Sequence, residues 1–499
     1  MRWLGNRTSR ASAVLASPDE SGDDPRMSQG VSVPAVNEQL LAERLKRLEA
    51  ALPGQDDLLA LFEDFLRTAS DDLLVRINPI KFAQQHGLTA AAVIELFLHA
   101  RKVALLTMEW QYVCPGCGEI VERLPSLTSA TAHYFCQVCS ADRDADLSDF
   151  IEVTFSVSPD VRRSRYHDPW SLDPEEHFFD YRFSQSAVVD DGSPLRDHLR
   201  ETAAACAYVD PGKTEKFKVE AEPGFVWLTN GPALIVDESR TDKARKFEFE
   251  YTGTRSKGFR AEIAAGPVEI AFTNATDEPY ALMINRLPDH YEVGMQPFLS
   301  GAALLSNQTF LDLFETETID AGEGLAVKRL GLLFTDLEGS TALYERIGDM
   351  KAFDLVRQHF GYLRESIARN SGALVKTIGD AVMASFVDPL DALRAAIEMR
   401  TQIARFNAEA GADQIALKVG LHTGACLAVT LNDRLDYFGQ TVNIAARVQA
   451  LAGAGEIVIT DDVLSLPGAT ELVAGIRMEE TSVELKGVAG EIRVYRLRP

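Results

Sequence analysis

The chain has 499 residues, of which 46% are hydrophobic and 25% are charged, and its net charge at pH 7 is −24. This length exceeds what one hydrophobic core supports, so we expect a soluble protein of about three or four domains. So acidic a chain is a poor general nucleic-acid binder, because neutralising phosphates requires clustered Lys and Arg.

Neither a membrane span nor an export signal is predicted. The most apolar stretch, residues 90–110, is interrupted by charged and polar side chains, and residues 1–17 contain arginines without a continuous apolar run. Four of the six cysteines lie in one cluster, which does not look like an extracellular disulfide framework. We therefore expect a cytoplasmic protein.

The N-terminal part is predicted to be a tail followed by helices. Residues 1–33 are rich in Ser, Asp, Arg and Gly, which is typical of disorder. Residues 34–110 show leucines at helical spacing and are predicted to form a helical domain. Within it, residues 77–99 resemble the helix, turn and helix of a winged-helix domain, with Thr89 as a cap. The alternative is a plain helical bundle that binds protein, and the acidic surroundings favour it over DNA contact.

Residues 111–148 are predicted to form a zinc ribbon. Two C-x₂-C pairs are separated by 18 residues, and their members are Cys114, Cys117, Cys136 and Cys139. This spacing is typical of a structural four-cysteine zinc site, and Gly116 and Gly118 permit the tight turn that it needs. Four thiolates leave no open coordination position, so the expected role of Zn²⁺ is structural. An iron–sulfur cluster is the alternative.

Residues 149–290 are predicted to form a β-rich, sandwich-like domain with a helical insertion near residues 195–206. Short segments of β-forming residues alternate with turn residues such as Asn230-Gly231. The predicted strands are residues 151–157, 217–220, 225–228, 247–251, 268–272 and 280–284. No catalytic constellation is seen in this domain. Residues 291–329 are predicted to be a helical linker.

The last third of the chain carries two carboxylates at predicted strand ends. Asp336 ends an apolar β-type run, after which Gly339 and Ser340 turn the chain into a helix. Asp380 lies in a predicted hairpin turn between strands at residues 373–378 and 381–386. Two acids without His or Cys beside them suit Mg²⁺. Two such ions on a nucleoside triphosphate are a recurring solution for displacement at phosphorus.

Residues 330–499 alternate strand, helix, strand, strand, helix and strand, which predicts a ferredoxin-like βαββαβ core within a multidomain α+β protein. Four motifs follow one another here: FTDLEGST at 334–341, KTIGD at 376–380, VGLHTG at 419–424 and DYFGQTVNIAAR at 436–447. On these motifs the domain resembles the class III nucleotidyl cyclases. The part before it resembles, more weakly, the uncharacterised region that precedes some bacterial cyclase domains.

The resemblance implies a metal site and a purine site. Asp336 and Asp380 would hold two Mg²⁺ or Mn²⁺ ions per active site, with the Leu337 carbonyl as a further ligand. Lys376 and Asp436 would read the purine of ATP. A Lys donor facing adenine N1 and an Asp acceptor facing the exocyclic amine suit adenine, whereas guanine presents the reverse polarity.

The resemblance also implies roles on the helix of the fourth motif. Asn443 and Arg447 lie four residues apart and share one helix face. Asn443 would orient the ribose, and Arg447 would stabilise charge growing on the α-phosphoryl group. Lys486 would bind the triphosphate. His422 is expected to be structural, and Gln440, where many relatives carry an acid, is expected to have little effect.

In this family the metal aspartates and the other site residues come from opposite subunits. One chain here carries both sets, which implies a homodimer with two composite sites. The predicted function is that of an adenylate cyclase that makes cyclic AMP and pyrophosphate, with the first 325 or so residues sensing or positioning. The alternatives are a guanylate cyclase, a catalytically silent nucleotide-binding scaffold and a transcription regulator. The signal, a ligand or a partner protein, is left open.

Overall fold

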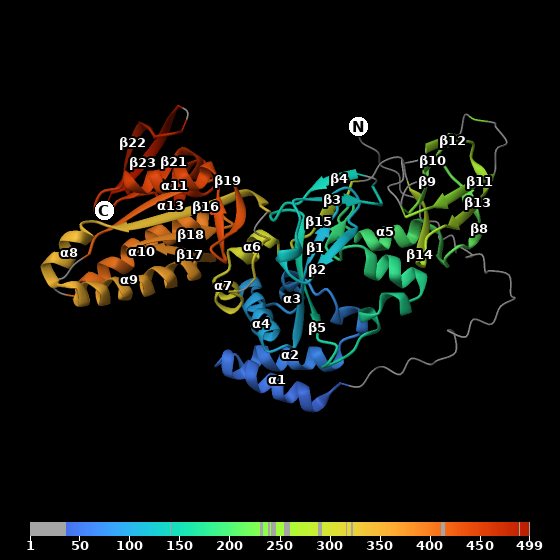
Figure 1. Cartoon of the computed structure of the whole chain (residues 1–499), viewed down its shortest axis with the longest axis horizontal. Helices are drawn as coiled ribbons and strands as arrows, with labels where there is room; N and C mark the ends of the chain where they lie inside the picture. Colours follow the sequence, from blue (N-terminus) through green and yellow to red (C-terminus); the bar gives the residue numbers. More distant parts are fainter. Residues whose placement is uncertain are drawn as a thin grey trace.

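The computed structural model describes residues 36–498 apart from 140, 230–232, 238–239, 241–245, 254–259, 288–291, 316, 321–322, 411–414 and 489. The predicted tail at residues 1–33 and the turn at Asn230-Gly231 lie outside the described residues. Figure 1 shows three bodies in a row along the long axis. The C-terminal domain lies at one end, the helices and a small sheet lie in the middle, and the β-rich part lies at the other end.

Four helices begin the described chain: α1 (Glu38–Ala51), α2 (Asp56–Thr68), α3 (Pro79–Gln85) and α4 (Ala90–Lys102). The Thr89 side chain accepts a hydrogen bond from the Ala92 N–H at 3.3 Å, so the predicted cap of α4 is confirmed. The helices share one hydrophobic core with a three-stranded antiparallel sheet of order β2-β1-β5. Its strands are β1 (Leu106–Val113), β2 (Ile120–Leu124) and β5 (Ile151–Val157).

The predicted boundary at residue 149 is wrong, because it cuts through this sheet. β5 was assigned to the β-rich domain, yet it pairs with β1 from Leu106↔Val157 to Tyr112↔Ile151. All seven residues of β5 are buried, so the strand belongs to the core of the helical body. The local sequence pattern marks a strand but does not identify its partner.

The β-rich part contains two sheets. One has the order β12-β10-β9-β14-β7 and the other the order β11-β13-β8, and their inner faces share one hydrophobic cluster. The strands are β7 (Ala203–Val209), β8 (Thr214–Ala221), β9 (Gly224–Leu228), β10 (Ala233–Val236), β11 (Lys246–Tyr251), β12 (Arg260–Ile263), β13 (Gly266–Asn274) and β14 (Tyr280–Leu287). The predicted β-rich character is confirmed. The helical insertion α5 (Leu195–Thr202) is shorter than predicted, because Cys206 already lies in β7.

Smaller elements connect these bodies. Two ribbons pair β3 (His133–Cys136) with β4 (Ala141–Asp144), and β6 (Ala187–Val188) with β15 (Gly294–Met295). A π-helical segment covers Glu176–Arg182, and 3₁₀ turns cover Asp71–Leu74, Leu127–Ser129, Arg165–His167 and Pro169–Ser171. α6 (Gly301–Leu305) and α7 (Gln308–Leu313) then lead to β16 (Leu325–Leu337). The predicted linker of residues 291–329 therefore extends too far, because the first strand of the C-terminal domain begins at Leu325.

The C-terminal domain is built on one sheet of order β17-β18-β16-β19-β21-β23-β22, and β20 pairs with β19. Its elements after β16 are α8 (Ser340–Ile347), α9 (Asp349–Arg369), β17 (Gly372–Ile378), β18 (Ala381–Phe386), α10 (Pro389–Ala410), β19 (Leu417–Leu431), β20 (Arg434–Phe438), α11 (Gln440–Ala450), β21 (Ile457–Thr460), α12 (Asp461–Leu464), α13 (Ala469–Leu472), β22 (Arg477–Glu484) and β23 (Glu491–Arg498). The first four strands lie in the order second, third, first, fourth. The predicted ferredoxin-like βαββαβ core is confirmed.

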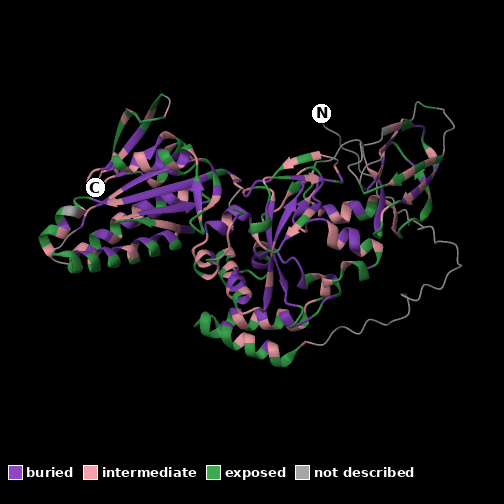
Figure 2. Cartoon of the chain, in the orientation of Figure 1, coloured by how far each residue is buried: buried purple, intermediate pink, exposed green. Residues whose placement is uncertain are grey.

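The central strands of this sheet are buried on both faces (Figure 2). α9 and α10 pack on one face. On the other face, Phe334, Tyr437 and Ala445 join the core that also contains Phe310 of α7 and Trp110 of β1. The N-terminal region and the C-terminal domain thus share a continuous hydrophobic core.

Among the described helices, none combines the length and apolarity needed to cross a bilayer.

Candidate active site

The two predicted metal acids lie at the adjoining ends of the neighbouring strands β16 and β18. Asp336 is the penultimate residue of β16, and Asp380 lies in the turn between β17 and β18. Thr335 pairs with Val382 in the antiparallel register, so the two acids reach the same edge of the sheet. Gly379 adopts a positive φ of 65°, a conformation that favours glycine, and this allows the tight turn before Asp380.

The surroundings of both acids fit cations. In the described part of the chain, the enclosed Oδ2 of Asp380 has no hydrogen-bond partner. Asp336 Oδ2 lies 2.6 Å from the Lys418 Nζ, which is also 3.5 Å from Glu338 Oε2. The hydrogen bond to Asp336 raises the pKa of Lys418, so this side chain is a fixed positive charge. Carboxylate oxygens with a free lone pair suit Mg²⁺ or Mn²⁺.

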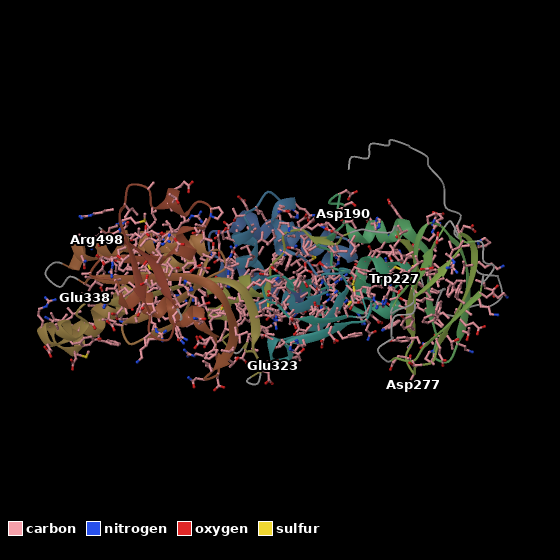
Figure 3. All side chains as sticks on the ribbon, turned by 90° about the horizontal axis from the view of Figure 1, so that it is seen from above. Asp190, Trp227, Asp277, Glu323, Glu338 and Arg498 are labelled. Atoms are coloured by element: carbon pink, nitrogen blue, oxygen red, sulfur yellow. The ribbon has the colours of Figure 1, made fainter. Side chains whose placement is uncertain are left out.

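Sequence reasoning missed Lys418. It reaches Asp336 because the two residues face each other across β16 and β19, a register that the sequence does not reveal. The available signal was a lysine within the otherwise apolar start of β19. Figure 3 labels Glu338, which lies with this group of charges at the end of the domain remote from the N-terminal region.

The two predicted purine-reading residues touch each other. Lys376 of β17 forms an ion pair with Asp436 of β20 although 60 residues separate them. Asp436 is only 7% exposed, and its other carboxylate oxygen accepts from the Tyr437 N–H at 2.8 Å. The fold therefore holds a donor and an acceptor side by side, as two-point recognition of a flat base requires.

The remaining predicted residues lie on and beside α11. Gly420 of β19 lets this helix approach closely, since a Cβ there would lie 2.2 Å from the Gln449 backbone nitrogen. A Cβ on Gly487 would lie 3.7 Å from both terminal nitrogens of Arg447, so the arginine lies against the loop that carries Lys486. Asn443 is one turn before Arg447 on the same helix.

The metal acids and the residues of α11 form two groups without a polar link between them in the described part of the chain. Among the described residues, neither Asp336 nor Asp380 forms a hydrogen bond or ion pair with Arg447. His422 is buried, its Nδ1 lies 2.9 Å from Thr460 Oγ1, and burial lowers its pKa. These contacts support the structural role predicted for it.

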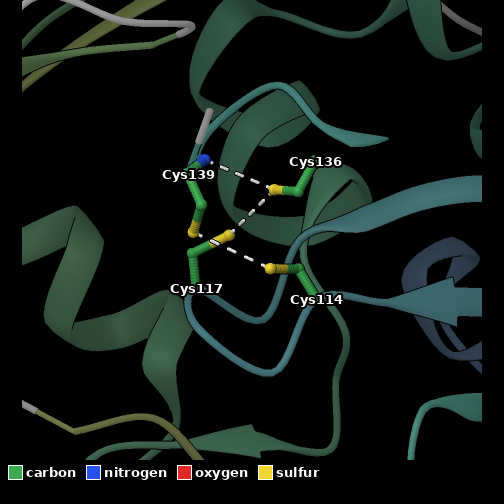
Figure 4. A group of neighbouring side chains, drawn as sticks. All are labelled: Cys114, Cys117, Cys136 and Cys139. Carbon is green, nitrogen blue, oxygen red and sulfur yellow. Dashed lines mark hydrogen bonds between the residues drawn. The ribbon is translucent and has the colours of Figure 1, made fainter. Parts of the chain in front are cut away.

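The four cysteines form a second site in the N-terminal region. Their Sγ atoms all lie within 4.8 Å of one another (Figure 4). The Cys114–Cys139 and Cys117–Cys136 sulfur pairs are 3.7 and 3.6 Å apart. A tetrahedral Zn²⁺ with bonds of about 2.3 Å would hold its sulfurs roughly 3.8 Å apart, so the cluster has the right size. A Cβ on Gly116 would lie 3.2 Å from Cys139 Sγ, which explains the glycine in this turn.

Comparison with known families assigns both parts of the chain. Residues 44–312, more than half of it, match a family of unknown function, DUF5939. The chain belongs to the DUF5939 family. Residues 326–499 match the adenylate and guanylate cyclase catalytic domain, so the C-terminal domain is a nucleotidyl cyclase domain preceded by a DUF5939 region. The predicted family is confirmed.

Several relatives are named as adenylate cyclases. One from Anabaena cylindrica is 30% identical over 200 residues, which are 36% of this chain and 39% of the relative. A pH-sensitive adenylate cyclase from Mycobacterium tuberculosis is 28% identical over 39% of this chain and 49% of its own length. The chain thus spans less than half the length of these relatives. The solved adenylyl cyclase CyaB from P. aeruginosa is 24% identical, covers 36% of this chain and 96% of its own, and gives a TM-score of 0.31.

Proposed function

We propose that this protein is an adenylate cyclase that converts ATP to cyclic AMP and pyrophosphate. The observation that carries the proposal is the contact between Lys376 and Asp436. The ammonium group can donate to adenine N1, and the carboxylate can accept from the 6-amino group. Guanine has a donor at N1 and an acceptor at O6, so both contacts would be mismatched and discrimination should be strong. A guanylate cyclase is the alternative that this pair disfavours.

Asp336 and Asp380, with the Leu337 carbonyl, are proposed to hold two Mg²⁺ or Mn²⁺ ions. Such ions, when bound, acidify the ribose 3′-hydroxyl and neutralise the leaving pyrophosphate. Lys418 adds a positive charge beside these acids, and we assign it to the triphosphate. The ammonium group of Lys418 would stabilise the negative triphosphate whether or not it keeps its ion pair with Asp336.

The second half of the site is proposed to bind ribose and phosphate. Asn443 would hold the ribose, and Arg447 would stabilise negative charge at the α-phosphorus in the transition state. Lys486, in the loop against which Arg447 lies, would contact the triphosphate. All the residues that the chemistry needs are present, which argues against a catalytically silent scaffold.

We infer that the active form is a homodimer with two composite sites. The support is that one chain carries both sets of residues while, among the described residues, Arg447 forms no hydrogen bond or ion pair with either metal acid. A site formed between two copies would bring the arginine of one to the acids of the other, and an isolated copy would then be inactive.

The DUF5939 region is proposed to sense a signal or to position the cyclase domain. Its cysteine cluster would hold one structural Zn²⁺, as its sulfur spacing supports. Helices α3 and α4 are followed by the sheet β2-β1-β5, an order compatible with a winged-helix domain, but the acidic chain favours protein contact over DNA.

The test is turnover of purified full-length protein with ATP or GTP in the presence of Mg²⁺ or Mn²⁺, with cyclic nucleotides measured by chromatography. We expect cyclic AMP from ATP and far less cyclic GMP from GTP. Asp380→Asn should lower the rate by at least about 10²-fold. Asp433→Asn is a matched control, because Asp433 is an exposed turn residue of the same domain and Asn tolerates its positive φ of 60°. Preference for GTP, or no cyclic product at all, would contradict the proposal.

A further inference from the structure

The last residues of the DUF5939 region and those that follow them lie directly on the strands that carry the proposed purine-reading pair. We call residues 306–319 the connecting segment; it contains α7. Its side chains form hydrogen bonds with β17, β18 and β20, and its backbone with β19. A covalent linker alone would not need such contacts.

Gln308 fixes the strand of Lys376. β17 is the edge strand of the sheet, and the Gln308 Oε1 accepts from the Leu374 N–H at 2.8 Å. Between Leu374 and Lys376 the pairing with β18 shifts register, and such an irregularity turns the side chains that follow it. Gln308 thus holds the backbone at the point that directs Lys376. Its Nε2 donates to Asp312 Oδ1 at 2.9 Å, which orients the amide.

Ser306 contacts the strand of Asp436. Its hydroxyl accepts from Ser385 Oγ at 3.2 Å and lies 3.5 Å from the Tyr437 Oη. These three residues are at most 3% exposed, so each hydroxyl depends on the other two for partners. Tyr437 follows Asp436 directly and donates its N–H to that carboxylate. A shift of Ser306 would therefore be transmitted to Asp436.

The same segment is also fixed to α4 and β1, which lie earlier in the DUF5939 region. Phe310 packs edge-on against Trp110 with ring centroids 6.0 Å apart, and Lys102 of α4 donates to the Leu313 carbonyl at 2.7 Å. A rearrangement of α4 or β1 would reach the segment through these contacts.

We propose that Gln308 and Ser306 are positioning residues that set the spacing of Lys376 and Asp436, and that the DUF5939 region governs nucleotide recognition through them. The inference rests on the proposed function. Because the segment contacts the strands of the purine-reading pair, its changes should alter the binding of ATP and its discrimination from GTP more than the chemical step.

The test is Gln308→Met in the full-length chain, which keeps the side-chain length and removes the acceptor for Leu374. We expect the KM for ATP to rise about 3- to 10-fold, the range for loss of one hydrogen bond, with kcat changed less than about 2-fold. The ATP-to-GTP ratio of kcat/KM should fall by a similar factor. Gln85→Met is the matched control, since Gln85 is an exposed glutamine near the end of α3. Ser306→Ala tests the contact with β20, the strand of Asp436, independently. It replaces Gln308→Met in the experiment if that variant does not fold.

The outcomes separate the explanations. An unchanged KM and nucleotide ratio in both variants would overturn the inference. A fall in kcat alone would indicate a merely structural role, and a lower KM would mean that the segment obstructs the purine site; both would also overturn it. A wild-type chain that makes no cyclic AMP would instead refute the proposed function itself.

Discussion

We propose that nucleotide preference depends on two side chains whose charges neutralise each other in the structure. Lys376 and Asp436 come from different strands, and Asp436 is nearly inaccessible to water. A buried carboxylate needs a partner, so the pair is stable before a base arrives. Its residue types could be read from the sequence, because each lies in a recognisable motif. Lys418 could not, because it belongs to the site only through the pairing of β16 with β19.

Reversing the hydrogen-bond polarity of this pair should reverse the nucleotide preference. Lys376→Glu supplies an acceptor for guanine N1–H, and Asp436→Asn supplies a donor for O6. The double variant should lower kcat/KM for ATP by at least about 10²-fold and raise the GTP-to-ATP ratio by more than that. Steady-state kinetics with both nucleotides measures this. A ratio that stays at the wild-type value would show that other groups read the base.

A buried histidine of the DUF5939 region makes stability depend on pH. Burial lowers the pKa of His177 to about 4, and its Nδ1 lies 3.0 Å from the Pro169 carbonyl. The unfolded chain takes up a proton near pH 6.5 and the folded one does not, so stability is full above that pH and declines as pH falls toward 4. Between pH 7 and 5 the loss should be about 2 kcal/mol. Urea unfolding should show it, and His177→Gln should flatten the curve. If the free energy of unfolding of the variant depends on pH as steeply as that of the wild type, this assignment is contradicted.

At the scale of elements, the local sequence was sufficient to predict where strands lie. It was not sufficient to predict which distant strands they pair with. The strand predicted at residues 381–386 is β18, and the strand predicted at residues 373–378 lies within β17. Alternation and turn residues are properties of neighbouring residues, so the sequence displays them. β5 and the start of β16 were assigned to the wrong units, because a strand's partner is chosen by packing across the chain.

The cysteine cluster should bind one zinc ion per chain. Cys117→Ser should lower the zinc content measured by mass spectrometry well below one per chain. It should also lower the unfolding temperature of the DUF5939 region, because metal binding stabilises the fold that presents the ligands. Cys206→Ser is the control, since Cys206 lies in β7 outside the cluster. Iron with visible absorption would favour the iron–sulfur alternative, and a protein that stays metal-free after reconstitution with zinc would exclude the zinc site.

At the scale of the whole molecule, the chain is organised around a shared core. Trp110 of β1, Phe310 of α7 and Tyr437 of β20 belong to one hydrophobic cluster that continues from the DUF5939 region into the cyclase domain. If the DUF5939 region senses a signal, as we propose, a packed path connects it to the strands of Lys376 and Asp436. The sequence showed two families in one chain but not this continuity, because apolar residues do not indicate which distant residues they contact.

The composite site is tested most directly by mixing two inactive variants. Asp336→Ala loses a metal acid and Arg447→Ala loses the transition-state charge, so each alone should be at least about 10²-fold less active. With random pairing in an equimolar mixture, half of the dimers are mixed, and each has one intact site of two. The mixture should therefore recover up to about a quarter of wild-type cyclic AMP production.

A mixture of Asp336→Ala with Asp380→Ala is the matched control, since both changes affect the same half and should not rescue each other. The decisive measurement is cyclic AMP production from the first mixture. Recovery toward a quarter of wild-type activity is the predicted result, and activity no higher than that of either variant alone would contradict a site shared between two chains.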